Sequence, residues 1–349
     1  MKKLILSAGM IALLASCSTS KNAPISDPNV DYAAKYAATI TEKDLAKHLF
    51  VYASDEFEGR NTGEPGQKKA VKYLKDFYVQ EGIASALGGD DYFQEVPASF
   101  LNKGRRRGAP LKDSENVVAF IKGTEKPDEV LVISAHLDHE GIKNGKIYNG
   151  ADDDGSGTVA ILEIAEAFQK AAKDGRGPKR SILFLHVTGE EKGLLGSKFY
   201  VENPIFPLAN TVADLNIDMV GRIDDRHKDN PNFVYLIGAD KLSTELHDLS
   251  EAMNSKYTNI SLDYKYNDEK DPNRFYYRSD HYNFAKYNIP IIFYFNGTHE
   301  DYHQPTDTPD KINYDLLENR TRLVFHTAWE IANRDKRLVV DKPVTPPSK

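Results

Sequence analysis

The sequence contains little cysteine, no long basic run and no apolar run long enough to cross a membrane. Cys17 is the single cysteine among 349 residues, so no intramolecular disulfide can form. The formal net charge is −7, and the one basic cluster, residues 104–108 (GRRRG), lies between turn-forming residues as a solvated loop would. We therefore expect no nucleic-acid partner. No repeat of solenoid period is visible, which excludes a repeat array.

The N-terminus has the pattern of an export signal. Two lysines precede an apolar run over residues 4–14, and small residues follow it up to Cys17. A run of this length is too short for a stable transmembrane helix and is typical of a secretory signal peptide, here residues 1–16. Residues 14–17 (LASC) also resemble the lipobox of bacterial lipoproteins, which implies a lipid on Cys17. The alternative is a plain signal peptide cleaved near Ala15.

From this pattern we expect an exported protein that touches a membrane only through its N-terminal lipid. Ser18 follows the cysteine and, by resemblance to enterobacterial sorting, favours the outer membrane, with the protein facing the periplasm or the outside. A polar tether over residues 17–40 and a disordered tail over 339–349 would flank the rest. Residues 41–338 are near the upper size for one hydrophobic core, so we expect one catalytic domain. The sequence carries no signal for its oligomeric state.

Helical and strand-like segments alternate through this domain. Apolar residues recurring at intervals of three and four, or strong helix formers, predict helices over 41–52, 66–78, 158–172, 243–254, 280–287 and 313–334. Short apolar or β-branched runs predict strands over 91–96, 116–123, 129–136, 180–187, 212–219, 233–238 and 289–295. The alternation predicts an α/β fold, a three-layer sandwich with a mostly parallel mixed central sheet flanked by helices. In such sheets ligands bind beyond the carboxyl ends of the strands.

Histidines and acids follow several of the predicted strands. His136 and Asp138 are two residues apart at a strand end, which suggests an imidazole on a metal and a carboxylate behind it that fixes its tautomer. By strand periodicity His139 faces the other way, so we expect a structural or rim position for it. Asp218 lies inside an apolar stretch, where an unpaired carboxylate would be costly and is normally neutralised or coordinated. A single loop histidine such as His303 carries no weight alone.

Two acidic turns complete the pattern. In residues 150–157 (GADDDGSG) a carboxylate held in a tight turn could bridge two cations, although such a turn before a helix is commonly only a solvated cap. Glu190 and Glu191 are neighbours after a predicted strand, which usually means a surface turn. One could nevertheless bind metal while the other acts as a base. The joint occurrence of these features predicts a metal-dependent hydrolase.

Taken in order, these motifs resemble the zinc aminopeptidases of peptidase family M28. The resemblance covers about residues 41–335 and also includes the serine, aspartate and histidine at 279–281. It implies that Asp153 bridges two Zn²⁺ ions, for which Mn²⁺ or Co²⁺ could substitute, and that a non-proline cis peptide follows Asp153. It also implies the remaining ligand and catalytic roles: Glu191 and His303 at one metal, His136 and Asp218 at the other, Glu190 as general base and Asp138 supporting His136.

The segments around the expected site bear on the substrate. The gap between residues 91 and 116 is too short for the protease-associated insert of many family members, and residues 255–278 are expected to form part of the substrate rim. The resemblance places Tyr276 near the substrate carbonyl. Met219 and two strand residues, Phe293 and Phe295, are expected to form an apolar substrate pocket without a fixed cation.

The function expected from the sequence is removal of N-terminal residues from peptides by a two-zinc mechanism. One alternative is a single-zinc glutaminyl cyclase on the same fold. The turn sequence DDDGSG disfavours it, because the corresponding turn of the cyclases has a sequence that resembles DSA. Another is a carboxypeptidase-type specificity within the family, which would depend on basic residues in the pocket. The third is a non-catalytic binding module, which the presence of all five ligands and the base disfavours.

Overall fold

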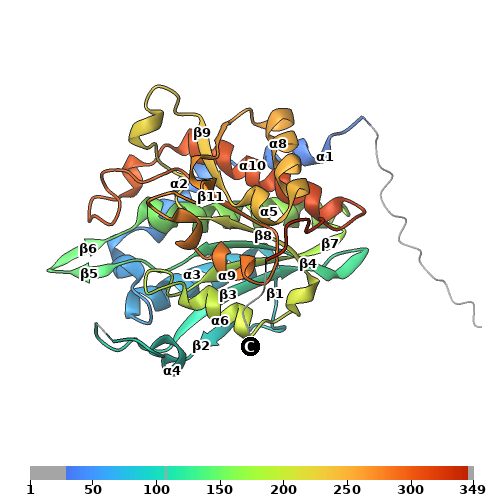
Figure 1. Cartoon of the computed structure of the whole chain (residues 1–349). Helices are drawn as coiled ribbons and strands as arrows, with labels where there is room; N and C mark the ends of the chain where they lie inside the picture. The colour runs from blue at the N-terminus through green and yellow to red at the C-terminus, as the bar shows by residue number, and fades with distance from the viewer. Residues whose placement is uncertain (1–28, 107, 345–349) are drawn as a thin grey trace, which may run out of the picture.

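The computed structural model describes residues 29–106 and 108–344 (Figure 1). The expected signal peptide, Cys17 and the last five residues of the expected tail lie outside these ranges. Within the described ranges, no helix combines the length and apolarity needed to cross a membrane.

The helices and strands follow the predicted order, with several short additions. The helices are α1 (Tyr32–Ala37), α2 (Glu42–Tyr52), α3 (Pro65–Glu81), α4 (Ala98–Leu101), α5 (Gly157–Lys173), α6 (Leu195–Glu202), α7 (Ala239–Leu242), α8 (Thr244–Tyr257), α9 (His281–Ala285) and α10 (Tyr314–Asn333). The strands are β1 (Ala84–Ser85), β2 (Phe93–Val96), β3 (Ser114–Ile121), β4 (Lys126–His136), β5 (Gly141–Lys143), β6 (Lys146–Tyr148), β7 (Arg180–Val187), β8 (Thr211–Ile217), β9 (Phe233–Ile237), β10 (Ser261–Asp263) and β11 (Ile291–Phe295).

A nine-stranded mixed sheet forms the middle layer, in the order β1-β3-β7-β4-β8-β11-β9-β10 with β2 beside β3. The four central strands, β7, β4, β8 and β11, are parallel to one another. The flanking pairs β3·β7 and β9·β11 are antiparallel, as are both pairings of β3 with β1 and β2. The expectation of a mostly parallel sheet therefore holds for the centre of the sheet, which carries the site.

Helices cover both faces of the sheet (Figure 1). Side chains from α2, α3, α5, α8 and α10 pack on one face, against residues such as Leu131 and Ile133 of β4. Residues of α6 and α9 pack on the other face, against Val130 and Val132 of the same strand. Successive residues of β4 therefore pack on opposite faces, and both faces are covered. This burial explains the apolar runs at residues 130–133 of β4 and 182–185 of β7.

Both ends of the domain extend beyond the predicted bounds. Helix α1 lies within the expected tether, but Tyr36 and Ile40 are buried in the core, so the tether prediction is wrong for this part of the chain. At the other end, Val339 and Val344 donate backbone hydrogen bonds to Glu245 and Asn288, so the tail is attached as far as residue 344. Between β2 and β3, where many family members carry the protease-associated insert, this chain has the short helix α4.

Candidate metal centre

The central parallel strands bring the predicted site residues to one edge of the sheet. In the register of β4 and β7, His136 pairs with Val187, and each is the last residue of its strand. Asp218 follows the last residue of β8, and Glu190 follows β7 by three residues. Because carboxyl ends of parallel strands meet at a common edge, these side chains converge.

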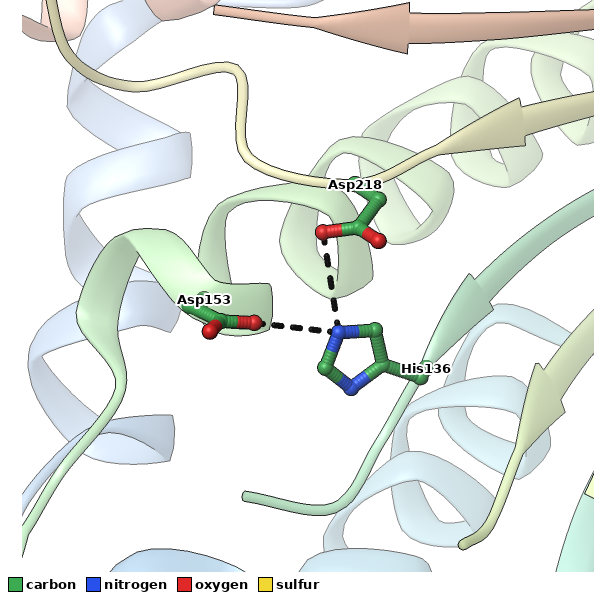
Figure 2. A group of neighbouring side chains, drawn as sticks. All are labelled: His136, Asp153 and Asp218. Atoms are coloured by element: carbon green, nitrogen blue, oxygen red, sulfur yellow. Dashed lines mark ion pairs between the residues drawn. The ribbon is translucent and has the colours of Figure 1, made fainter. Parts of the chain in front are cut away.

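One group of potential ligands consists of His136, Asp153 and Asp218 (Figure 2). Nε2 of His136 lies 3.1 Å from Oδ1 of Asp153 and 3.6 Å from Oδ1 of Asp218. All three residues are buried. Ser279 donates a 2.6 Å hydrogen bond to the other oxygen of Asp218, so this carboxylate is held in orientation.

A second group shares Asp153 with the first. Nε2 of His303 lies 3.0 Å from Oδ2 of Asp153 and 3.3 Å from Oε1 of Glu191. His303 has a left-handed backbone, with φ of 54°, which is uncommon outside glycine and occurs often at functional sites. The structure therefore brings all five predicted ligands together, and the two oxygens of one carboxylate, that of Asp153, face different histidines.

The three consecutive aspartates of the turn have three different tasks. Asp152 accepts a 2.7 Å hydrogen bond from the N–H of Gly221, and Asp153 points into the cluster. Asp154 accepts hydrogen bonds from the N–H groups of His136 and Met219 and so fixes the two strand ends. The peptide bond between Asp153 and Asp154 is cis, as the family resemblance implied.

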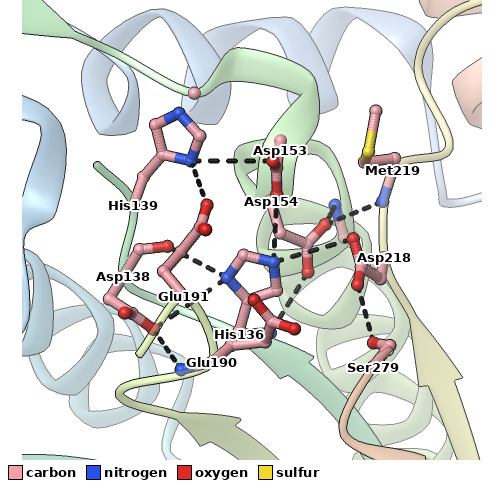
Figure 3. A network of polar contacts seen from close by, with 12 residues as sticks. His136, Asp138, His139, Asp153, Asp154, Glu190, Glu191, Asp218, Met219 and Ser279 are labelled. Carbon is pink, nitrogen blue, oxygen red and sulfur yellow. Dashed lines mark hydrogen bonds and ion pairs between the residues drawn. The ribbon is translucent and has the colours of Figure 1, made fainter. Parts of the chain in front are cut away.

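Asp138 supports the site in a different way from the one predicted. Nδ1 of His136 lies 3.0 Å from the backbone carbonyl oxygen of Asp138 and 4.0 Å from its carboxylate. The carboxylate instead accepts a hydrogen bond from Thr62 Oγ1, at 2.7 Å. It also accepts one from the N–H of Glu190, at 3.1 Å (Figure 3). The prediction assumed a regular strand, but β4 ends at His136, and the chain beyond it turns the carboxylate toward Glu190.

The expectation that His139 faces away from the site is wrong for the same reason. Its side chain is completely buried, and Nδ1 lies 2.9 Å from Oε1 of Glu191 and 3.8 Å from Oδ2 of Asp153 (Figure 3). Strand periodicity does not apply past the end of β4, so His139 and His136 approach the cluster from different sides.

The cluster's charges shift several pKa values in the direction that a cation site requires. Burial lowers the pKa of His136, but Asp218 and Asp153 outweigh it and raise this pKa well above its usual value. For His303, Asp153 and Glu191 overcome the effect of burial and raise the pKa to about 10. Burial raises the pKa of Asp153, yet the surrounding imidazoles hold it well below its usual range. The carboxylates thus attract positive charge, which a divalent cation can supply in place of ring protons.

Several buried polar atoms of the cluster fit metal ions as partners. Within the described ranges, Oδ2 of Asp153, Oε1 of Glu191 and both ring nitrogens of His139 are buried and make no hydrogen bond. Buried polar atoms are nearly always paired, so these four need a partner. The available donors are nitrogen and oxygen without sulfur, a set that suits Zn²⁺ and accommodates Mn²⁺ or Co²⁺.

A pocket adjoins the cluster. It is lined by Asp153, Glu190, Asp218, Met219, Phe275, Arg278, Phe293, Phe295, Tyr302 and His303. The three residues predicted to form its apolar wall, Met219, Phe293 and Phe295, are therefore present. The expectation of a pocket without a fixed cation is wrong, because Arg278 is part of the wall. Its guanidinium lies over the Phe275 ring at 5.0 Å and contacts the Tyr302 hydroxyl at 3.3 Å.

Tyr276 does not line this pocket, contrary to the role that the resemblance implied. It lines a separate depression, where Lys241 lies 5.0 Å above its ring. The 3₁₀ helix η6 (Phe275–Tyr277) turns successive side chains in different directions, so Phe275 faces the pocket and Tyr276 does not. Tyr302 supplies an aromatic hydroxyl to the pocket instead.

Sequence reasoning missed further residues that shape the site. Asp307 accepts hydrogen bonds from the N–H groups of Asp152 and Asp153, at 3.0 and 3.1 Å, and so holds the aspartate turn in place. Arg60 is completely buried and donates to the carbonyls of Leu137 and Gly150, on the segments before and after the β5–β6 hairpin. Asp307 lies in residues 306–310 (TDTPD), shortly after His303, but no local pattern shows its contacts or the burial of Arg60.

The chain is similar to several known proteins in sequence and in fold. A probable zinc metalloprotease from Pyricularia oryzae is 27% identical over 308 residues, covering 76% of this chain and 59% of the relative, so the chain spans less than two thirds of that protein. The LapA aminopeptidase of Legionella pneumophila is similar in structure, with a TM-score of 0.64 at 22% identity over 87% of this chain and 75% of LapA. Glutaminyl cyclase of Porphyromonas gingivalis gives a TM-score of 0.63 at 16% identity over 83% of this chain and 98% of the cyclase.

These structural relatives show the fold. The family itself follows from the sequence, because the family model described as peptidase family M28 matches residues 116–328. That range begins in β3 and ends in α10, and it contains both ligand groups, Glu190 and every pocket residue. The chain belongs to peptidase family M28.

Proposed function

We propose that the protein is a two-zinc aminopeptidase that removes N-terminal residues from peptides. The observation that carries the proposal is the position of Asp153, whose carboxylate oxygens lie 3.1 Å from Nε2 of His136 and 3.0 Å from Nε2 of His303. One carboxylate between two separate nitrogen donors is the arrangement that a pair of cations needs. Membership of a zinc peptidase family supports the same reading.

Zinc ions held there would polarise the scissile carbonyl and increase the acidity of the attacking water. Glu190 is the residue placed to take the water's proton, because it lines the pocket beside Asp153 and Asp218. Burial raises the pKa of Glu190 well above its usual value, so the carboxylate has the basicity that a proton acceptor requires. After the peptide bond breaks, the same group returns the proton to the leaving amine.

The charge of the pocket favours a substrate with a free N-terminus. Asp153, Glu190 and Asp218 surround the position where a substrate's first residue would lie. Of the three, Glu190 is not a proposed metal ligand, so its charge remains available to attract an α-ammonium group, whereas the neutral backbone of an internal peptide bond gains no such Coulomb attraction. This difference supports exopeptidase over endopeptidase action.

Metal stoichiometry and activity measured on one preparation test the proposal. Metal-free protein would be titrated with Zn²⁺ while hydrolysis of leucine p-nitroanilide is followed. We expect activity to rise to full value between one and two equivalents. Full activity at one equivalent would contradict the two-zinc mechanism, and cyclisation of an N-terminal glutaminyl peptide in place of hydrolysis would indicate the single-zinc cyclase.

For the cellular location, our proposal is an exported enzyme held on the outer membrane by a lipid on Cys17. It rests on the signal-like residues 1–16 and the lipobox resemblance, both outside the described ranges. Labelled fatty acid should enter the wild type and not Cys17→Ala. Equal labelling of the two proteins would contradict it.

A further inference from the structure

We propose that His139 is an additional metal ligand, binding through Nδ1 the cation held by Glu191, His303 and Asp153. The inference rests on the proposed two-metal site and adds a residue that the family resemblance did not supply. Nδ1 of His139 lies 2.9 Å from Oε1 of Glu191 and 3.8 Å from Oδ2 of Asp153, and these three atoms form a group compact enough to hold one ion.

The surroundings of His139 differ from those of other buried histidines. His186 contacts the Tyr78 hydroxyl at 2.6 Å, His281 contacts the carbonyl of Tyr276 at 2.8 Å, and each thereby pairs one ring nitrogen. Within the described part of the chain, His139 is the one histidine whose two ring nitrogens are both buried without a hydrogen bond. An imidazole buried without partners is costly unless something else satisfies it.

The short contact between His139 and Glu191 is not a hydrogen bond. Its 2.9 Å separation is short enough, but Nδ1 and Oε1 lack hydrogen-bond geometry, so neither atom has a hydrogen-bond partner. Oδ2 of Asp153 is also without a hydrogen bond. A cation bound by all three atoms would satisfy an imidazole nitrogen and two carboxylate oxygens together.

The chain holds the His139 ring in position by packing. A Cβ atom on Gly150 would lie 2.5 Å from Cγ of His139, so this glycine leaves the room that the ring occupies. The carbonyl of Arg60 accepts the N–H of His139 at 3.3 Å, and the guanidinium of Arg60 donates to the carbonyl of Gly150 at 2.8 Å. A ring placed in advance in this way suits a ligand, because little ordering is left for the binding step.

His139 would make the two metal positions unequal. The cation beside Glu191 would have two imidazole ligands, His139 and His303, whereas the cation beside Asp218 would have one, His136. Imidazole suits zinc and cobalt, whereas manganese prefers carboxylate and water. We therefore expect the first equivalent of Zn²⁺ or Co²⁺ to bind at the His139 position.

Paramagnetic proton NMR of the cobalt-loaded protein in H₂O can count the bound imidazoles. Each Co²⁺-bound ring contributes one strongly shifted N–H signal that disappears in D₂O. With two Co²⁺ bound we expect three such signals in the wild type, two in His139→Asn and three in the control His186→Asn, which alters a histidine of equal burial paired with Tyr78. Two signals in the wild type would overturn the proposal whether or not the variants fold.

The same experiment separates this inference from the proposed function. If only one Co²⁺ binds, the two-metal proposal fails. Two signals from that single ion would still support His139 as a ligand, whereas one signal would reject it. With two metals bound, chelator competition should show that His139→Asn weakens one site by more than the roughly 10- to 100-fold typical of losing an outer-shell contact. An unchanged affinity would count against the ligand role.

Discussion

The backbone N–H of Glu190 donates a 3.1 Å hydrogen bond to the carboxylate of Asp138. The carbonyl of the same aspartate lies 3.0 Å from Nδ1 of His136. Asp138 therefore contacts both the proposed general base and a proposed metal ligand, through different atoms. A change to its side chain should affect the base more than the metal.

Asp138→Ala should keep two equivalents of zinc and lose turnover. The contact to His136 comes from the backbone and survives, whereas the N–H of Glu190 loses its acceptor. Misplacement of a catalytic group by about 1 Å can cost on the order of 100-fold in rate, and we expect a fall in kcat of that order. Zinc content by elemental analysis and kcat, measured on one preparation, show whether the Asp138 carboxylate supports the base or the metal site. Loss of one zinc would show that the carboxylate matters chiefly to His136.

Glu190→Gln should also retain both metals, because it removes the base and none of the proposed ligands. Loss of a general base typically costs about 10²- to 10⁴-fold in rate. We expect a fall in kcat within that range and a smaller change in KM. A variant with near-normal kcat and normal zinc content would exclude Glu190 as the base.

The pocket predicts a preference for apolar N-terminal residues. Burial of a leucine side chain against Phe275, Phe293 and Phe295 is worth about 1.5–3 kcal/mol. Arg278 is exposed, and an exposed ion pair with a substrate carboxylate is worth about 0–1 kcal/mol. We therefore expect a higher kcat/KM for leucyl than for glutamyl or aspartyl p-nitroanilide.

Arg278→Ala is the control for this preference. It should lower kcat/KM for the glutamyl substrate by less than about tenfold, the factor that corresponds to 1.4 kcal/mol, and leave the leucyl value almost unchanged. If the wild type instead prefers the glutamyl substrate, and the variant loses that preference, then Arg278 and not the aromatic wall determines specificity.

A buried acid remote from the metal centre should make stability depend on pH. Glu163 on α5 is buried with both carboxylate oxygens without hydrogen bonds, 3.7 Å from Nε2 of His48. Burial raises its pKa from the ordinary 4.5 to about 8. Because the pKa of Glu163 is higher in the folded protein than in the unfolded chain, its protonated form contributes to stability. This contribution is complete at pH values below the pKa of the unfolded chain, and it is lost as the pH rises through the pKa of the folded protein. That window is about pH 4.5 to 8.

Glu163→Gln removes this loss. The difference in Tm between the variant and the wild type should therefore increase from pH 5 to pH 8. At about 1.4 kcal/mol per pKa unit, the corresponding change in the free energy of unfolding is several kcal/mol. Glu330→Gln, a partly exposed position on α10, serves as the control and should show no such trend. A difference independent of pH would mean that Glu163 is ionised in the folded protein throughout.

The fold was predictable because the strands that form its centre are the strongest patterns in the sequence. The second half of β4 and all of β7 are buried, and residues 130–133 (VLVI) and 182–185 (ILFL) within them are unbroken apolar runs. Helix α1 was missed because it has only six residues, and its stability comes from packing of Tyr36 against Trp329. Short elements held by distant contacts have little local signal.

The positions of His136 and Asp218 were predictable because each ends or directly follows a strand, whereas the full set of five proposed metal ligands, His303 included, came from the resemblance to family M28. The orientation of side chains beyond a strand end was not predictable. Asp138 and His139 both follow β4, where the two-residue alternation stops, and both point in directions that a strand would not give them. Tyr276 lies in the three-residue 3₁₀ helix η6 and Arg278 directly follows it, and so short an element has no sequence periodicity that would show which side chain reaches the pocket.

The measurement that tests the central claim most directly is the zinc content of Asp153→Ala beside that of Asp218→Ala. If the Asp153 carboxylate serves both cations, its loss should weaken both sites, whereas loss of Asp218 should weaken only the site that includes His136. After dialysis against a weak chelator we expect close to zero bound zinc in Asp153→Ala and close to one equivalent in Asp218→Ala. Two tightly held equivalents in Asp153→Ala would show that Asp153 does not bridge the metals.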